Sequence, residues 1–309
     1  MKRVLVTGAA GFVGRQTIDP LRRRGFDVHT VTRATPVPGT RWHAADLMDP
    51  AAQRRLLEAV RPTHLLHLAW ETEPGFFWAA PVNLDWLAAS LTLLRAFRET
   101  GGQRIVVAGS CAEYDWADPA LAGDLPETAP RRPATLYGHA KDSLRRMLDA
   151  YARDTGLSHG WGMLFQAYGP HEKAGRVIAS VVKALLEGRP AACSAGTQLR
   201  DFMDCRDIGP AFAALLDSEV QGAVNIASGE AVTVAEVVTR LGALTGRPDL
   251  VQLGARPMAA GEPPRLVADI TRLRREVGYA PAIPLDRGLA ESVAWWREEL
   301  HLPLAGAGI

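Results

Sequence analysis

A tyrosine and a lysine four residues apart, Tyr137 and Lys141, are the residues whose types and spacing most directly indicate chemistry. If their segment is helical, both side chains lie on one face of the helix. A lysine ammonium lowers the pKa of a neighbouring phenol, so Tyr137 could give a proton to a carbonyl oxygen or take one from an alcohol. The pair therefore predicts proton transfer at a carbonyl or alcohol carbon.

A glycine-rich turn near the N-terminus predicts where a dinucleotide would bind. The apolar run Val4-Leu5-Val6 leads into Thr7-Gly8-Ala9-Ala10-Gly11-Phe12-Val13-Gly14. Gly8 permits a tight turn, Gly11 lets the chain approach the phosphates, and Gly14 allows close packing of helix against strand. A strand followed by such a turn and a helix presents backbone amides to a pyrophosphate. We therefore expect a nicotinamide cofactor bound by Gly8, Ala10, Gly11, Phe12, Val13 and Gly14, with Tyr137 at the reacting carbon and Lys141 on the nicotinamide ribose.

The end of the second expected strand distinguishes between the two nicotinamide cofactors. Proteins that bind NAD place a carboxylate there to hold the ribose 2′-hydroxyl. This chain has Val31-Thr32-Arg33 instead, and Arg15 follows the glycine turn. Because an arginine fork suits a 2′-phosphate, Arg33 and Arg15 favour NADP(H) over NAD.

Strands and helices alternate through the first half of the chain. Nearly continuous apolar runs predict parallel strands that are covered on both faces, with helical stretches between them. This alternation predicts an α/β fold with a Rossmann-type doubly wound parallel sheet. The expected strands are Arg3–Thr7, Asp27–Thr32, Thr63–Ala69, Arg104–Gly109 and Ser158–Phe165, and the expected helices are Phe12–Arg24, Ala51–Val60, Val82–Thr100 and Leu136–Asp154.

The pattern changes after Tyr168. We expect residues 1–168 to form the cofactor-binding domain and residues 169–309 to form mainly a smaller α/β substrate-binding domain. The chain is expected to cross back between the two around residues 207–227, where a helix precedes a strand.

Composition and charge exclude several classes of function. The 309 residues are 47% hydrophobic and 22% charged, which is ordinary for a globular protein. A net charge of +1 gives no strong attraction to nucleic acid or to an anionic membrane. No apolar run approaches the ~18 residues of a membrane span. The three cysteines are scattered without metal-like spacing, so we expect a cytoplasmic protein without a metal site.

The spacing Gly-x-x-Gly-x-x-Gly resembles that of the extended short-chain dehydrogenases/reductases, the nucleotide-sugar epimerase/dehydratase/reductase family. Ala45-Asp46-Leu47 resembles the element that contacts adenine in this family. His67-Leu68-Ala69 resembles the end of the family's fourth strand, and Asn83 stands where the family carries an asparagine at a helix start. The resemblance implies that Asp46, Leu47, Leu68, Ala69 and Asn83 contact the cofactor.

The same resemblance assigns a third group to the reacting carbon. Ala108–Asp115 is similar to the family's fifth-strand element, in which a Ser or Thr lies four residues before an aromatic residue. This similarity implies that Ser110 binds the reacting oxygen. In the family's 4,6-dehydratases an Asp-Glu pair follows this hydroxyl residue. Here the pair is Cys111-Ala112, so elimination of water by that route is not expected. Glu113 comes one place later and is expected on the opposite side of an extended segment.

The second half of the chain resembles the family's substrate-binding elements. Gln198–Met203 is similar to an Arg-Asp-Phe/Tyr element whose arginine holds the substrate's diphosphate, which implies that role for Arg200. Arg265 stands where the family offers a second arginine. Gln166 lies in a segment similar to the one that lines the sugar pocket. Two arginines on a diphosphate would position the sugar through charge-assisted hydrogen bonds.

The resemblance implies an NADP(H)-dependent oxidoreductase that acts on a nucleotide-diphosphate sugar. The favoured reaction is reduction of a 4-keto-deoxyhexose, with Tyr137, Lys141 and Ser110 at the reacting carbon. One alternative is a nucleotide-sugar 4-epimerase with tightly bound NAD, and another is a non-catalytic NADP-sensing protein. The resemblance also implies a homodimer that pairs through the helices Val82–Thr100 and Leu136–Asp154.

Overall fold

The computed structural model describes residues 2–118, 123–259 and 261–302. Its centre is a seven-stranded sheet with the order β11-β6-β5-β4-β1-β2-β3, in which every pair is parallel. This is the Rossmann-type fold expected from the sequence. The strands are β1 (Arg3–Thr7), β2 (Asp27–Thr32), β3 (Arg41–Ala44), β4 (His64–His67), β5 (Arg104–Ser110), β6 (Ser158–Leu164) and β11 (Gly222–Ile226).

The strands of the sheet centre are buried on both faces, which explains their continuous apolar runs. Val4, Leu5 and Val6 of β1 are completely buried, as are Leu65 and Leu66 of β4. The edge strand β3 was not expected. Its residues are partly exposed on both faces, so the segment lacks the apolar run that marks a central strand.

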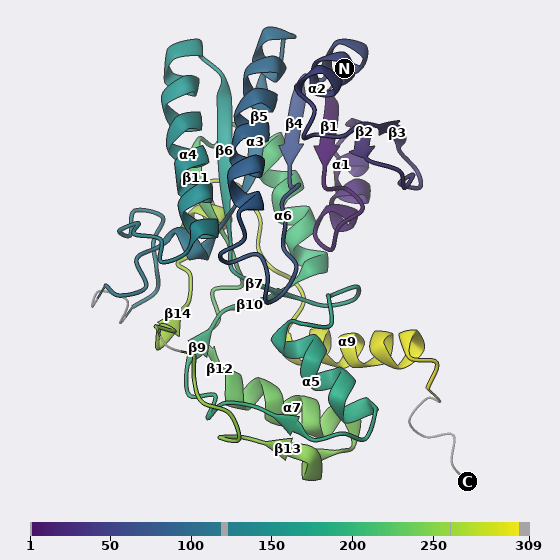
Figure 1. The fold of residues 1–309 in the computed structure, drawn as a ribbon, viewed down its shortest axis with the longest axis vertical. Helices are drawn as coiled ribbons and strands as arrows, with labels where there is room; N and C mark the ends of the chain where they lie inside the picture. The colour runs from purple at the N-terminus through teal and green to yellow at the C-terminus, as the bar shows by residue number, and fades with distance from the viewer. Residues whose placement is uncertain (1, 119–122, 260, 303–309) are drawn as a thin grey trace.

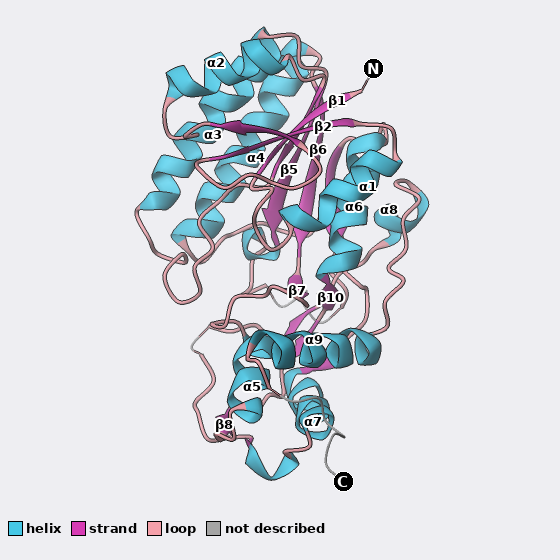
Figure 2. Cartoon of the chain, turned by 90° about the vertical axis from the view of Figure 1, so that its right-hand side faces the viewer, coloured by secondary structure: helices cyan, strands magenta, loops and turns pink. Residues whose placement is uncertain are grey.

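Helices cover both faces of the sheet (Figures 1 and 2). One layer packs α2 against α3 and α3 against α4, and the other packs α1 against α6. The bounds are α1 (Ile18–Arg23), α2 (Pro50–Val60), α3 (Val82–Glu99), α4 (Leu136–Thr155) and α6 (Cys205–Asp217).

The single helix expected over Phe12–Arg24 is divided in the structure. A 3-10 turn, η1 (Gly14–Thr17), comes first, and α1 begins at Ile18. Pro20 therefore lies in the first turn of α1, where a backbone N–H has no partner within the helix. The position of Pro20 explains why a proline is tolerated there.

A second hydrophobic cluster lies beyond the carboxyl ends of the sheet strands. It is formed mainly by α5 (Val177–Leu186), α7 (Val234–Thr245) and α9 (Leu285–Glu299), which Figure 2 shows below the sheet. The remaining elements are short: η2 (Cys111–Glu113), β7 (Gln166–Tyr168), β8 (Ala191–Ala192), β9 (Leu199–Arg200), β10 (Phe202–Asp204), β12 (Val232–Thr233), η4 (Pro248–Leu250), β13 (Val251–Gln252), β14 (Arg265–Leu266) and α8 (Thr271–Arg275).

The chain returns from the second cluster to the sheet through α6 and β11. The whole of β11 pairs with β6, with Gly222 opposite Gly160 and Ile226 opposite Leu164. Across the described residues no helix is both long and apolar enough to cross a membrane.

Candidate active site

A cavity of about 590 Å³ opens at the carboxyl ends of the sheet strands. In a doubly wound sheet this is where ligands bind, and the volume is within the range of small-molecule sites. The cavity brings together most of the residues that were expected from the sequence. Those that line it are Gly8, Ala10, Gly11, Phe12, Val13, Gly14, Arg33, Asp46, Leu47, Leu68, Ala69, Ser110, Tyr137, Lys141 and Gln166.

The glycine turn has the geometry that a dinucleotide needs. Gly8 has a φ of +69°, and a Cβ there would lie 2.8 Å from the backbone nitrogen of Ala69. A Cβ on Gly14 would overlap the carbonyl oxygen of Gly8, and Gly11 donates its N–H to that oxygen at 2.9 Å. The backbone is therefore packed as tightly as it can be, which leaves the space in front of the turn for phosphates. The turn fits a bound dinucleotide.

A buried polar network joins the glycine turn to the end of β4. The Thr7 hydroxyl lies 2.7 Å from His67 Nδ1 and accepts the backbone N–H groups of Leu68 and Ala69. The other ring nitrogen of His67 lies 2.8 Å from the Ser90 hydroxyl. Burial lowers the pKa of His67 to about 3, so the imidazole stays neutral and serves to join Thr7 to Ser90.

The end of β2 carries no carboxylate toward the cavity. The Thr32 hydroxyl accepts Trp42 Nε1–H at 2.8 Å and donates to the Thr35 carbonyl at 2.6 Å, so its single O–H is already committed. Arg33 lines the cavity, is exposed, and has no ion pair or side-chain hydrogen bond within the described residues. Its guanidinium is free to bind an anion.

Arg15, by contrast, is not in the cavity lining. Its guanidinium donates to the Ala10 carbonyl at 3.1 Å, and its charge acts on His171 from the second cluster. The structure therefore does not place Arg15 beside Arg33 at the cavity, because its guanidinium is bonded to the Ala10 carbonyl and lies outside the lining.

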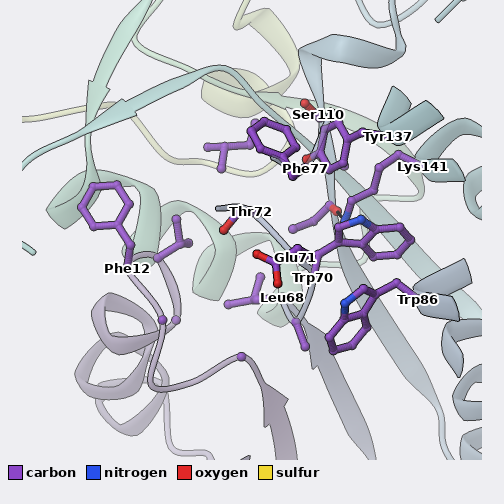
Figure 3. Close-up of a pocket in the computed structure, with 18 of the residues that line it drawn as sticks. Phe12, Leu68, Trp70, Glu71, Thr72, Phe77, Trp86, Ser110, Tyr137 and Lys141 are labelled. Atoms are coloured by element: carbon purple, nitrogen blue, oxygen red, sulfur yellow. Dashed lines mark hydrogen bonds between the residues drawn. The ribbon is translucent and has the colours of Figure 1, made fainter. Parts of the chain in front are cut away.

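Tyr137 and Ser110 lie together at one end of the cavity, with Phe77 beside them (Figure 3). Burial raises the pKa of Tyr137 to about 12, while the Ser110 hydroxyl and the charge of Arg176 oppose this rise. The sequence predicted that Lys141 would lower this pKa, but burial outweighs any such effect. At neutral pH Tyr137 is therefore a protonated phenol, the form that can donate a proton to a carbonyl oxygen.

The Lys141 ammonium lies on the helix face expected from the spacing. Its Nζ donates to the Ala108 carbonyl at 2.9 Å and lies 3.8 Å from the centre of the Trp70 ring. Figure 3 shows this side chain between Tyr137 and Trp70. Burial lowers the pKa of Lys141 to about 7, against the charge of Glu113, which raises it.

The two residues after Ser110 bring no carboxylate into the cavity. Burial raises the pKa of the Cys111 thiol to about 12, so Cys111 is a packed neutral thiol rather than an acid or base. Glu113 lies in the 3-10 turn η2 and not in the extended segment that the sequence suggested. The Glu113 carboxylate is completely buried and accepts the N–H of Ser110 and the indole N–H of Trp161.

Asn83 is a structural residue rather than a cavity residue. Its amide nitrogen donates to the carbonyls of Phe77 and Ala80, and its amide oxygen accepts Trp70 Nε1–H at 2.8 Å. Both polar atoms are thus used, and Asn83 does not line the cavity. The predicted cofactor contact is corrected: Asn83 supports Trp70 and the loop that ends at Ala80.

The two arginines expected on a diphosphate also lie outside the cavity lining. The buried Arg200 guanidinium donates to the carbonyls of Leu199 and Pro263 and pairs with Glu262 at 2.7 Å. Arg265 pairs with Asp124 and donates to the Gly123 carbonyl. Both charges are balanced within the fold, so neither guanidinium is free in this structure, and their role on a diphosphate stays a prediction.

Sequence reasoning missed several residues that line the cavity. Glu71 and Thr72 point into it from the loop after β4 (Figure 3), and Phe77 and Trp78 pack edge-on against the Tyr137 ring. Their position directly after a central strand could have revealed them, since strand ends meet at this edge. Trp70 and Trp86 line the same side.

Arg176 lines the cavity from the start of α5 and was not expected there. No ion pair or side-chain hydrogen bond of Arg176 is found in the described part of the chain. Its charge lowers the pKa of Tyr137, which indicates that the guanidinium is near the phenol. No pattern in the sequence marks it, because α5 folds over the cavity from the second cluster.

Comparison with known proteins defines the class to which this fold and site belong. The model of the NAD dependent epimerase/dehydratase family matches residues 4–227, and the chain belongs to this family of extended short-chain dehydrogenases/reductases. It is an enzyme of the epimerase/dehydratase family.

Relatives with solved structures match the chain over nearly its full length. MoeE5 in complex with UDP-glucuronic acid and NAD is 32% identical, with a TM-score of 0.81 over 96% of this chain and 99% of that protein. UDP-glucose 4-epimerase from Thermus thermophilus, in complex with NAD, is 26% identical, with a TM-score of 0.83 over the same shares.

A curated relative gives a match of similar extent. The UDP-glucose 4-epimerase of Azospirillum brasilense is 27% identical over 344 residues, covering 99% of this chain and 95% of that protein.

Proposed function

We propose that this protein reduces a 4-keto-deoxyhexose carried on a nucleoside diphosphate, with NADPH as the reductant. The observation that carries the proposal is the convergence of Tyr137, Ser110 and Lys141 on one cavity that also contains the free guanidinium of Arg33. The first three residues suit proton transfer at a carbonyl, and the fourth suits a 2′-phosphate.

The residues of the chain act on the oxygen of the reacting carbonyl. A bound nicotinamide supplies the hydride that reaches the carbonyl carbon. Tyr137 donates its phenolic proton to the oxygen, so that ketone, hydride and proton become an alcohol. Ser110 donates a hydrogen bond to the same oxygen, and the positive charges of Lys141 and Arg176 stabilise the phenolate that remains on Tyr137.

Arg176 is the proposed ligand for the substrate's diphosphate, in place of the neutralised Arg200 and Arg265. It is the arginine that approaches the cavity from the second cluster without a partner among the described residues. A nucleotide-linked substrate agrees with the UDP-glucuronic acid bound in the MoeE5 complex.

The variant Arg176→Ala is expected to raise the KM for the nucleotide sugar about 10- to 100-fold, because a charge-assisted hydrogen bond contributes about 1.5–3 kcal/mol. Initial rates across a range of substrate concentrations measure this. Arg189→Ala is the matched control, since Arg189 is exposed, pairs with Glu187 and does not line the cavity. An unchanged KM in Arg176→Ala would remove this residue from the diphosphate site.

NADP(H) is proposed over NAD because of Arg33, although the neighbours named above hold NAD. The variant Arg33→Ala is expected to weaken NADPH binding about 10-fold or more and to leave NADH binding nearly unchanged. Fluorescence titration with each cofactor measures both affinities. Arg15→Ala is the control and should alter neither affinity, since its guanidinium bonds to Ala10. Equal losses for both cofactors in Arg33→Ala would contradict the assignment.

The reaction itself is tested by incubating a panel of nucleotide-linked 4-keto sugars with NADPH and with NADH. Loss of absorbance at the reduced nicotinamide band and the stereochemistry of the product are followed. Turnover of at least one 4-keto sugar with net NADPH consumption is the expected result. If no 4-keto sugar of the panel is turned over and unmodified UDP-glucose binds tightly, the proposed reductase activity is wrong.

A 4-epimerase with bound NAD is the second candidate, and the similarity to UDP-glucose 4-epimerases, including the two named above, favours it. An epimerase returns the hydride to the same carbon, so it retains its cofactor through purification and consumes none. Retained NAD and interconversion of 4-epimers without absorbance change would select this candidate over the reductase.

Pairing of two copies through α3 and α4 stays a prediction. Its support is apolar exposure on these two helices, which pack side by side: Leu84 on α3 and Met147 on α4 are both more than half exposed.

A further inference from the structure

A carboxylate lies completely buried directly behind the cavity, and the reaction scheme above gives it no role. Glu113 ends the short η2 turn that follows Ser110. Its Oε1 accepts the backbone N–H of Ser110 at 2.8 Å, and both of its oxygens accept the Trp161 indole N–H at 3.1 Å. A buried carboxylate costs much free energy unless it is paired, so its retention there requires an explanation.

The local packing is shaped around this carboxylate. A Cβ at position 109 would lie 2.7 Å from Glu113 Oε1 and would overlap the Trp161 indole nitrogen. Gly109 is therefore the residue that lets the indole approach the carboxylate. Ser110 and Glu113 form a capping box. The Ser110 side chain accepts a backbone N–H of the η2 turn, and the Glu113 side chain accepts the backbone N–H of Ser110, which fixes the backbone at Ser110.

One cation near Glu113, Arg145, is already committed to other carboxylates. Arg145 Nε lies 3.8 Å from Glu113 Oε2, but its guanidinium also bonds Asp142 at 2.6 Å and Asp149 at 2.7 Å. Two closer carboxylates offset the single guanidinium charge. The charge of Glu113 is thus only partly offset by Arg145, and it also acts on Lys141 of the same helix, α4.

We propose that Glu113 is a positioning residue that keeps the buried Lys141 side chain positively charged at the cavity and holds Ser110 in place. The inference rests on the proposed function for the roles of Lys141 and Ser110. The juxtaposition is set by β5: Lys141 Nζ donates to the Ala108 carbonyl at 2.9 Å, and two residues further along the strand the Ser110 N–H donates to Glu113 Oε1 at 2.8 Å.

The electrostatics of the two groups agree with this geometry. Burial lowers the pKa of Lys141 to about 7, and the charge of Glu113 is what raises it. Burial raises the pKa of Glu113 to about 7, while the Ser110 N–H, the charge of Arg131, the Trp161 indole N–H and the charge of Lys141 lower it. Each group therefore stabilises the charged form of the other near neutral pH.

Other charged and titratable groups also face this pair. They are Tyr137 and Arg145 from α4, Cys111 from η2, Tyr114 directly after η2, Arg131 from the loop before α4, and His67 from β4. Cys111, Tyr114 and Tyr137 have raised pKa values and His67 a lowered one, so all four are neutral near pH 7. The charge of Arg131 also lowers the pKa of Glu113.

The sign of the effect gives a direct test. Without the Glu113 carboxylate, Lys141 loses its proton at a lower pH, so less of it is an ammonium at pH 7 to 8. The variant Glu113→Gln keeps an oxygen that can accept the Ser110 N–H and removes the charge. NMR of lysine labelled with 13C at Cε follows the titration, and Lys141→Met assigns the signal.

We expect the Lys141 midpoint in Glu113→Gln to fall by about one pH unit. Glu127→Gln is the matched control, since Glu127 is also buried and bonds the Asn225 N–H but does not act on Lys141. An unchanged Lys141 midpoint in a folded Glu113→Gln protein would overturn the proposal.

A reciprocal measurement decides the question if Glu113→Gln does not fold. The Trp161 indole N–H bonds the carboxylate, so its NMR signal reports whether Glu113 is ionised. Lys141→Met should move the midpoint of that signal to higher pH, whereas Lys183→Met on α5 should leave it in place. An unmoved midpoint in Lys141→Met overturns the proposal. Because neither titration needs a substrate, a failure here is distinct from a failure of the proposed reaction.

Discussion

The variant Tyr137→Phe is expected to lower kcat about 10²- to 10⁴-fold, which corresponds to about 3–5 kcal/mol of transition-state stabilisation. The phenolic hydroxyl is the proton donor, whereas the ring only packs against Phe77 and Trp78. Phenylalanine keeps those ring contacts and removes the one group that can protonate the oxygen. The affinity for NADPH should change little, because the glycine turn is untouched.

Two measurements check this expectation: NADPH consumption with the best 4-keto sugar of the panel, and the NADPH dissociation constant from fluorescence. Tyr151→Phe is the matched control, since Tyr151 lies on the same helix, α4, and does not line the cavity. Full turnover in Tyr137→Phe would show that the phenol is not the proton donor. Unchanged biological effect of that variant would favour the non-catalytic NADP-sensing alternative.

The variant Gly14→Ala is expected to weaken cofactor binding at least about 100-fold and to lower the melting temperature. Its new methyl group would overlap the Gly8 carbonyl oxygen and lie 2.8 Å from the Ala9 Cα. Neither neighbour can move without distorting the turn, because Gly8 is itself in contact with the backbone of Leu68 and Ala69. A distorted turn no longer directs its amides at a pyrophosphate.

Equilibrium binding of NADPH and thermal unfolding measure the two effects. Gly123→Ala is the control, since a Cβ at Gly123 meets no atom within 4 Å and its φ is not positive. Normal NADPH affinity in Gly14→Ala would mean that the turn does not hold the phosphates, and the cofactor site would have to lie elsewhere.

The parts of the site that depend on local pattern were predictable. The apolar runs of β1 and β4 predicted buried parallel strands, and the glycine spacing predicted the turn between β1 and η1. The four-residue spacing of Tyr137 and Lys141 predicted one helix face, and α4 presents both to the cavity. In each case neighbours within a few residues determine the conformation, so the chain carries the information locally.

The predicted site residues that lie outside the cavity lining are bonded to other groups of the fold. Arg200 is neutralised by Glu262, and the Asn83 amide is used by Trp70 and by the carbonyls of Phe77 and Ala80. No residue type or spacing reveals that a charge or an amide is already paired. The resemblance identified the right segments but could not tell which of their polar atoms remain free.

Local pattern in the chain was enough to specify the doubly wound fold, the dinucleotide turn and the Tyr–Lys pair, because periodicity and glycine geometry act over short distances. Long-range packing selected the cations that reach the cavity and the carboxylate that lies behind it. Arg176 arrives from the second cluster, and Glu113 is held by Trp161, 48 residues away. Burial then sets the pKa values of Tyr137, Lys141 and Glu113, because the cost of removing a charge from water depends on the whole surrounding fold.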